Sequence, residues 1–455
     1  MNRSRRDFLG RFLRAATLAA AAPASLAGRA ALPAPTPWRN WSGALAATPR
    51  ARVVPADEGE LIRFLRATAG PLRPAGSGHS FSPLVPTDGD LVVLDRLAGL
   101  AGVDEAGRRA SVRAGTRLAD LGPLLERTGQ ASVNLPDIDR QTLAGALATA
   151  THGTGDFPSL SGQVEALRLV TPRGDVRVLD GSEPELFAAA ATSLGALGVV
   201  TEATLAHVAP FRLRARNYPE RLDVLLEEFD ARVRRHRHFE FFPLPHCDWA
   251  LALEIDEAPE GAPTHNPPPT PEEDAALREA LELLLATPLL ARRTLANEIA
   301  QAIETTEAVD ASYRILCNVR NTRFNEMEYS VPADAGMACV REVLDTIADG
   351  IDVTFPLEVR YVAGEAPWLS MFEGGPRVSI SVHDFAERDH RPYFDRVEPV
   401  FRKYGGRAHW GKVHSLAAGE LRELYPRFDD FRRVRAEFDP EGRLLNPHLR
   451  AVLEA

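Results

Sequence analysis

The sequence of 455 residues contains only three cysteines, Cys247, Cys317 and Cys339. So few cysteines, and an odd number of them, cannot form a disulfide framework, so side-chain packing and hydrogen bonds must hold this fold together. We interpret the three residues as thiols without a chemical role.

Basic residues are fewer than acidic ones: 53 Lys and Arg stand against 63 Asp and Glu, which gives a formal net charge of −10. A protein that binds nucleic acid needs a basic surface to pair with phosphates, so no nucleic-acid partner is predicted. One short basic stretch occurs at residues 232–238, and we interpret it as the solvated end of a helix.

Long apolar segments are also missing, and no run approaches the ~20 apolar residues that a membrane-spanning helix needs. Near the start, Arg5 and Arg6 precede a short apolar stretch that Arg14 interrupts, and small residues follow. This order is typical of a twin-arginine signal peptide, here residues 1–27. It predicts export by the twin-arginine machinery to a periplasmic or secreted location, with no stable membrane span after processing. A retained N-terminal anchor is the alternative.

The sequence lacks both a G-x-G-x-x-G motif after a strand and an alternating series of strands and helices, which disfavours a nicotinamide-binding, doubly wound sheet. Instead, strand-like runs at 164–170 and 176–179 flank Pro172-Arg-Gly-Asp175, which predicts a hairpin. Ser182 and Glu185 predict a capping box at the start of the next helix. This mixture predicts an α+β fold, and the chain length predicts two domains.

The second half of the chain has its own pattern of strands and helices. A helical region at 272–304 is interrupted by Pro288, because proline cannot continue a helix. Strand-like runs occur at 313–319, 328–331, 357–362 and 378–382. We therefore expect a sheet with helices in the second domain.

One glycine-rich loop, Arg73-Pro-Ala-Gly-Ser-Gly-His-Ser-Phe81, has the composition of a ligand-binding segment. Gly76 and Gly78 allow positive φ and let main-chain N–H groups close on an anion such as a pyrophosphate, while Ser77 and Ser80 offer hydroxyl donors. An ordinary turn between two elements is the alternative.

Two charged residues share one face of a predicted strand. Glu358 and Arg360 are at i and i+2, so their side chains point the same way. From composition alone, a Glu and an Arg at this spacing are also typical of an ion pair on the protein surface. His383 closes another alternating strand, and a structural histidine is the alternative there. His409 and His414 share no helix face and have no third ligand nearby, so no metal site is predicted.

The glycine-rich loop resembles the phosphate-binding segment of flavoproteins of the vanillyl-alcohol-oxidase type. Three further segments resemble the branch of D-arabinono-1,4-lactone, L-gulono-1,4-lactone and alditol oxidases: Ala150-Thr-His-Gly-Thr-Gly155, His409-Trp-Gly-Lys412 and Phe438-Asp-Pro-Glu-Gly-Arg-Leu-Leu-Asn-Pro447. The matches follow the family's order from about residue 38 to the end. The resemblance implies an FAD-binding domain of the PCMH type in two parts at 38–209. A substrate-binding cap domain at 210–400 has an antiparallel sheet flanked by helices, and residues 401–455 return to the flavin site.

The resemblance also implies roles for single residues. FAD is the expected cofactor, attached covalently through His79, and the expected catalytic residues are Glu358, Arg360, His383 and Lys412. Thr142 stands where relatives have serine, and His152 is expected to be structural. Phe385 replaces a polar residue of the alditol oxidases, which favours a flatter or less hydroxylated substrate. The full set of expected FAD contacts is Pro74, Ala75, Gly76, Ser77, Gly78, His79, Ser80, Thr142, Ala150, Thr154, Gly155, Asp156, Val200 and His409.

The expected activity is oxidation of a carbinol of a sugar lactone or polyol, with hydride transfer to flavin N5 and oxygen as the electron acceptor. Two alternatives stay open. One is a dehydrogenase of the same fold that uses a quinone or a cytochrome, and the other is an exported protein that binds a sugar without turning it over.

Overall fold

The computed structural model describes residues 36–268, 270–318 and 321–454. The predicted signal peptide at 1–27 lies outside the described residues. Within the described residues, no helix is both long and apolar enough to cross a membrane.

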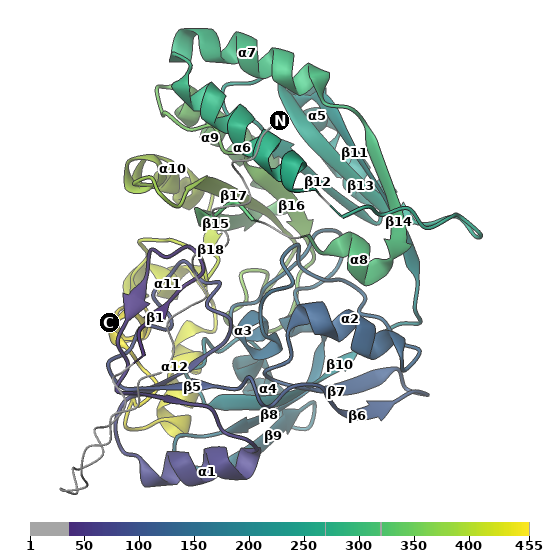
Figure 1. The fold of residues 1–455 in the computed structure, drawn as a ribbon. Coiled ribbons are helices and arrows are strands. Elements are labelled where there is room, and N and C mark those ends of the chain that lie inside the picture. Colours follow the sequence, from purple (N-terminus) through teal and green to yellow (C-terminus); the bar gives the residue numbers. More distant parts are fainter. Residues whose placement is uncertain (1–35, 269, 319–320, 455) are drawn as a thin grey trace, which may run out of the picture. The chain divides into compact units, whose positions relative to one another are not determined.

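The N-terminal half contains a small parallel sheet beside a larger antiparallel one (Figure 1). Helix α1 (Glu58–Ala67) begins at Asp57, whose side chain accepts a hydrogen bond from the Glu60 N–H. Leu61 and Leu65 of this helix are buried against the parallel sheet in one apolar cluster. That sheet has the order β3 (Ala51–Val53), β5 (Asp90–Val93), β4 (Leu72–Ala75).

The larger antiparallel sheet of this half has five strands. Leu118, Leu121, Leu143 and Leu147 of two helices, α2 (Leu118–Glu126) and α3 (Leu143–Ala148), are buried in the same apolar core as its strands. A third helix, α4 (Pro184–Ala191), packs on two of the strands. The strand order is β6 (Leu100–Asp104), β7 (Arg109–Arg113), β10 (Val199–Ala206), β8 (Val164–Val170), β9 (Val176–Asp180).

The second half is built on an eight-stranded sheet in which every pair is antiparallel. Its order is β14 (Thr306–Ala311), β11 (Arg212–Arg221), β13 (Trp249–Glu257), β12 (His238–Pro243), β16 (Glu358–Val362), β17 (Arg377–Phe385), β15 (Phe324–Pro332), β18 (Arg407–Ala408). Helices pack on this sheet: α5 (Leu222–Arg235), α7 (Leu289–Ala302), α9 (Gly336–Ala348) and α10 (Arg391–Lys403). The mixture of helices with antiparallel sheets confirms the predicted α+β class.

Alternation along β15 separates an apolar face from a charged one. Met327, Tyr329 and Val331 are buried in the apolar core, and the Tyr329 ring stacks on Phe401 of α10. Glu326 and Glu328 lie between them in sequence and therefore point to the other face. That face meets the first half of the chain, because His152 of that half hydrogen-bonds to Glu328.

The C-terminal segment returns to the first half of the chain. It contains α11 (Ala418–Leu424), α12 (Phe428–Phe438) and α13 (Pro447–Leu453). The Arg443 guanidinium donates to the carbonyl of Pro172 at 2.6 Å, and Arg73 donates to the carbonyl of Leu444 at 2.6 Å. The Arg73 bond joins β4, which leads into the glycine-rich loop, to the C-terminal segment, and the Arg443 bond joins that segment to the turn between β8 and β9. The predicted domain boundaries stay predictions.

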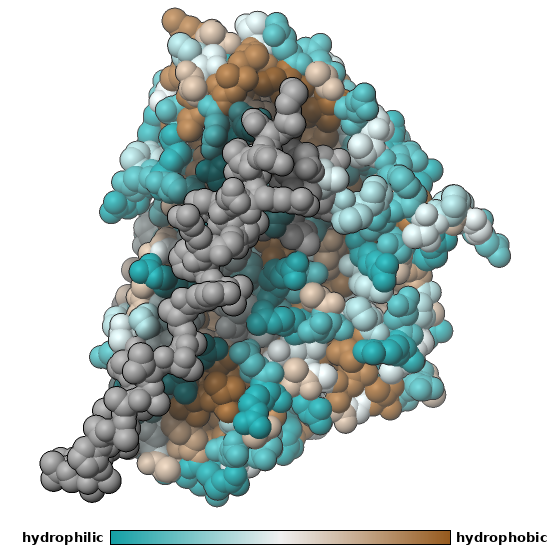
Figure 2. Space-filling model, in the orientation of Figure 1, coloured by the Kyte–Doolittle hydropathy of each residue, from teal (hydrophilic) through white to brown (hydrophobic). Residues whose placement is uncertain are grey.

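Exposed large apolar side chains gather on a helical hairpin of the second half. Leu277 and Leu283 belong to α6 (Pro271–Ala286), and Leu289 and Leu290 to α7. Figure 2 shows apolar surface over this hairpin. The break between the two helices falls at Pro288, as the sequence predicted.

Two local predictions were wrong, and a third was correct only in part. Residues 312–316 form a helix, α8 (Ser312–Leu316), in place of a strand, although β-branched and apolar residues occur there. The helix after β9 begins at Pro184 without a side-chain cap, because Ser182 lies one residue too early and donates to Asp180 at 2.6 Å. The basic stretch at 232–238 is solvated only in part: Arg234 and Arg235 at the end of α5 are exposed, whereas Arg232 is buried and pairs with Glu228 at 2.8 Å and with Glu254 at 3.3 Å.

Candidate active site

A cleft in the first half brings together segments that are far apart in sequence. Its walls are the glycine-rich loop after β4, α3 with the residues around it, residues 190–200, and residues 409–412. Gly78 has φ +74, and a Cβ added to Gly76 would lie 2.3 Å from the Thr142 hydroxyl oxygen. The loop therefore needs glycine at both positions, one for its backbone angle and one for close packing.

The glycine-rich loop fits a bound pyrophosphate. In the described part of the chain, no acceptor lies within hydrogen-bond distance of the backbone N–H groups of residues 77–80. Unpaired N–H groups that follow one another in a turn form an anion-binding concavity. The cleft beyond the loop is lined by Gly145, Gly195, Gly198 and several alanines, which leave room for a dinucleotide against the backbone.

Most of the predicted FAD contacts line this cleft: Pro74, Ala75, Gly76, Ser77, Gly78, His79, Ser80, Thr142, Val200 and His409. Ala150, Thr154, Gly155 and Asp156 are not among the lining residues. The Thr154 hydroxyl donates to the Phe239 carbonyl at 2.8 Å, and the Gly155 N–H donates to the Tyr361 carbonyl at 2.9 Å. This segment joins the two halves, and its role toward FAD stays a prediction.

His79 is held with its imidazole neutral. Trp41 stacks on the ring, with centroids 5.3 Å apart. Burial, followed by the nearby cations Lys412, Arg117 and Arg140, lowers the pKa of His79 to about 4. The uncharged ring keeps a lone pair, so it is a nucleophile over the whole neutral range.

Two buried glutamates of β15 belong to the site although the sequence analysis did not identify them. The side chains of Glu326 and Glu328 are 3% and 1% exposed. Their spacing of two residues is the same signal that placed Glu358 and Arg360 on one face of a strand. The signal was therefore present in Glu326-Met-Glu328, within a stretch of strand composition.

Arg360 lies between two carboxylates. One of its terminal nitrogens is 3.1 Å from Glu358 Oε2 and 3.3 Å from Glu328 Oε2. The Arg360 and Glu358 side chains are only 7% and 10% exposed, which excludes the surface ion pair. The Arg360 Nε is buried and has no hydrogen-bond partner in the part of the chain that the structure describes. One guanidinium donor is thus left for a ligand.

Lys412 and His383 meet the second glutamate. Lys412 pairs with Glu326 through a short contact, and His383 Nε2 is 3.6 Å from Glu326 Oε1. His383 Nδ1 lies 2.9 Å from the Pro356 carbonyl oxygen, so it carries the proton and donates. His383 Nε2 therefore faces the charged cluster.

The carboxylates of the cluster differ in how readily they take up a proton. Burial raises the pKa of Glu358. Burial acts in the same direction on Glu326, but Lys412 and His383 outweigh it and lower the pKa to about 2. Burial also opposes ionisation of Glu328, but Arg360 and His152 hold its pKa well below the ordinary value. Two carboxylates are thus fixed anions, and the third is the easiest to protonate.

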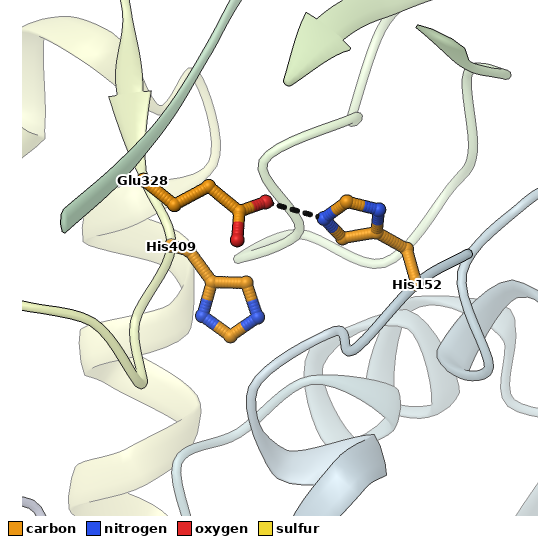
Figure 3. A group of neighbouring side chains, drawn as sticks. All are labelled: His152, Glu328 and His409. Atoms are coloured by element: carbon orange, nitrogen blue, oxygen red, sulfur yellow. Dashed lines mark hydrogen bonds and ion pairs between the residues drawn. The ribbon is translucent and has the colours of Figure 1, made fainter. Parts of the chain in front are cut away.

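The cluster contains two sets of donor atoms close enough to hold a metal ion. They are His152, Glu328 and His409 (Figure 3), and Glu326, Glu358 and His383, with donor atoms in each set within 4.8 Å of one another. In both sets the carboxylates already pair with Arg360 or Lys412. The anionic charge is thus compensated by the chain's own cations, and no metal site is proposed.

The chain is similar to known proteins over most of its length. Residues 203–452 match the D-arabinono-1,4-lactone oxidase family, and residues 49–180 match the FAD binding domain. The chain is 36% identical over 430 residues to L-gulono-1,4-lactone dehydrogenase of Mycobacterium tuberculosis, covering 91% of this chain and 99% of the relative. It is 28% identical over 433 residues to an alditol oxidase of Streptomyces sp., covering 91% and 98%.

A solved structure shares the fold. Cholesterol oxidase from B. sterolicum superposes with a TM-score of 0.75 at 17% identity, covering 92% of this chain and 96% of the other.

Proposed function

Because the chain belongs to the D-arabinono-1,4-lactone oxidase family and has an FAD-binding domain, we propose that it oxidises a carbinol of a sugar lactone or polyol with oxygen as the electron acceptor. One observation carries this proposal. Lys412 lines the cofactor cleft and also belongs to the buried cluster of Arg360, Glu326 and His383. A substrate held at the cluster would therefore adjoin the cofactor.

Bound FAD supplies the two-electron oxidant that takes the carbinol hydride. The protein's own residues handle the charge and the proton. As the hydroxyl loses its proton, negative charge develops on the substrate oxygen, and Arg360 and Lys412 stabilise it as preorganised cations. Glu358 orients Arg360, and His383 Nε2 takes the hydroxyl proton. The carbinol thereby loses a hydride and a proton to become a carbonyl, and oxygen that accepts the two electrons leaves as hydrogen peroxide.

The proposal is tested by mixing the holoenzyme without air with L-gulono-1,4-lactone, D-arabinono-1,4-lactone and a straight-chain alditol. Bleaching of the flavin absorption band by at least one of them supports oxidation. Binding without bleaching would identify a sugar-binding protein. Admission of air then tests the electron acceptor. Prompt return of the flavin band supports oxygen. A slow return in air that becomes fast when a quinone or a cytochrome is added contradicts oxygen as the acceptor.

We expect FAD to be bonded covalently to His79. The ring is neutral above about pH 4, the value to which its pKa is lowered. Attachment on adding FAD to apoprotein should therefore proceed at a similar rate from pH 8 down to pH 5. An ordinary histidine, with a pKa near 6.5, would lose most of its nucleophilic form over that interval. The measurement is the flavin that stays with the acid-precipitated protein at each pH.

His79→Ala should release all flavin on precipitation. His207→Ala is the matched control, because His207 is buried and its pKa is likewise lowered to about 4, but it is not among the cleft residues. A colourless pellet from the wild-type protein would contradict the bond and leave the fold untouched.

A further inference from the structure

Glu328 is the residue of the site with the most partners. Its Oε1 is 2.6 Å from His152 Nε2 and accepts a hydrogen bond from the Ser379 hydroxyl, and its Oε2 is 3.3 Å from Arg360 (Figure 3 draws the His152 contact). The two carboxylate oxygens therefore face different groups. Each group comes from a different element: the segment after α3, β17 and β16.

The backbone of the same residue adds a further link. The Glu328 carbonyl accepts a hydrogen bond from the His409 N–H at 2.9 Å, and the Glu326 carbonyl accepts one from Val413 at 2.9 Å. These bonds set the position of the segment that carries His409 and Lys412. The main chain of Glu328 thus positions one side of the cleft, and its side chain positions Arg360.

Both oxygens of the buried Glu328 carboxylate have partners. His152 Nδ1 is 2.8 Å from the Gly153 carbonyl oxygen, while Nε2 faces Glu328. Because an ionised carboxylate only accepts hydrogen bonds, His152 Nε2 carries a proton and donates to Glu328. This hydrogen bond and the Arg360 guanidinium together stabilise a carboxylate that is 1% exposed. A neutral side chain in place of Glu328 would leave the Arg360 guanidinium with one carboxylate partner fewer.

We propose that Glu328 is a positioning residue for the oxidation: it fixes the Arg360 guanidinium where the substrate oxygen gains charge and joins the His152 segment to β15. This inference rests on the proposed function. Glu358 also orients Arg360, and His152 is held by its contact with Glu328.

The test compares Glu328→Gln with the wild-type holoenzyme. Glutamine keeps the shape but removes the charge, so Arg360 loses its fixed anion and shifts. A displacement of about 1 Å at a catalytic group costs roughly 100-fold in rate. We expect anaerobic flavin reduction to slow about 30- to 100-fold at saturating substrate, while KM changes less than about threefold.

A second readout separates positioning from general damage. Acetate, a small anion, is titrated against the oxidised holoenzyme and followed by the perturbation of flavin absorption. With one negative charge removed beside Arg360 and Lys412, acetate should bind at least about threefold tighter in Glu328→Gln. A damaged site would weaken acetate binding and reduction together, and that outcome would overturn the proposal.

The matched control is Glu398→Gln. Glu398 is also a buried glutamate, bonded to the Tyr329 hydroxyl and, at 2.7 Å, to the Ser415 N–H, but it has no contact with Arg360. It should keep the wild-type rate and acetate affinity. A rate in Glu328→Gln within about threefold of this control, at equal flavin content, would also overturn the proposal.

Glu328→Asp covers the case in which Glu328→Gln does not fold. The shorter carboxylate keeps the charge but draws back from Arg360, and we expect a three- to tenfold slower reduction with acetate affinity unchanged. Wild-type reduction in Glu328→Asp would then count against positioning. If no lactone or alditol reduces the wild-type flavin, the proposed function fails, and the acetate titration still decides the role of Glu328.

Discussion

Replacement of Arg360 by alanine is expected to slow anaerobic flavin reduction by roughly 100- to 1000-fold, the usual cost of removing one preorganised donor from a developing oxyanion. Arg360 is buried, is held by Glu358 and Glu328, and keeps its Nε without a partner among the residues that the structure describes. Its contact with the substrate would be strongest in the transition state. The measurement is stopped-flow reduction of the flavin without air.

Two further variants test whether the expected loss of rate is specific to the Arg360 guanidinium. Arg360→Lys should recover only part of the rate, because a point charge replaces a planar fork that two carboxylates orient. Arg292→Ala is the matched control: Arg292 is equally buried and pairs with Asp352 at 2.8 Å, but it belongs to α7 and does not contact the cluster. Reduction in Arg360→Ala within about threefold of wild type, or a loss no larger than the loss of bound flavin, would refute the role of this residue.

Replacement of His383 by alanine is expected to slow the same step by roughly 100- to 10,000-fold, the usual contribution of a general base. The Pro356 carbonyl holds Nδ1–H at 2.9 Å, so Nε2 is the ring atom left to take the substrate proton. Alanine leaves Glu326 and Glu358 near that position, and both are paired with cations, Glu326 with Lys412 and Glu358 with Arg360. The pKa of Glu326 is also lowered to about 2, which makes it a poor base. Stopped-flow reduction with and without added imidazole is the measurement.

Imidazole from solution should restore part of the rate in His383→Ala, because it replaces the missing base. The control is His246→Asn. His246 also bonds to a backbone carbonyl, that of Ile351 at 2.9 Å, and it has φ +57, which asparagine tolerates. Equal losses in the two variants, or no response to imidazole, would assign His383 the structural role that the sequence left open.

The local sequence pattern was enough to predict the features that depend only on residues adjacent in the chain. The hairpin around Pro172 and Gly174, the break at Pro288 and the shared face of Glu358 and Arg360 all follow from the preferences of a few consecutive residues. The glycine-rich loop was identified from its composition alone, and Gly78 is needed for its own backbone angle. Gly76 is needed because the Thr142 hydroxyl lies close to it, which the local sequence does not show. Where the cap or the strand depended on the exact start of an element, as at Ser182 and at residues 313–319, the local prediction was wrong.

By itself, then, the sequence determined the α+β class, the family and the glycine-rich loop that lines the cleft. Only the tertiary structure decided that Glu358 and Arg360 are buried and that Glu328 is their neighbour. β16 and β15 flank β17 in the sheet, and His152 reaches Glu328 across 176 residues of chain. Strand order and such long-range pairs depend on which apolar faces pack together, and that choice is made by the whole core and not by any segment of it.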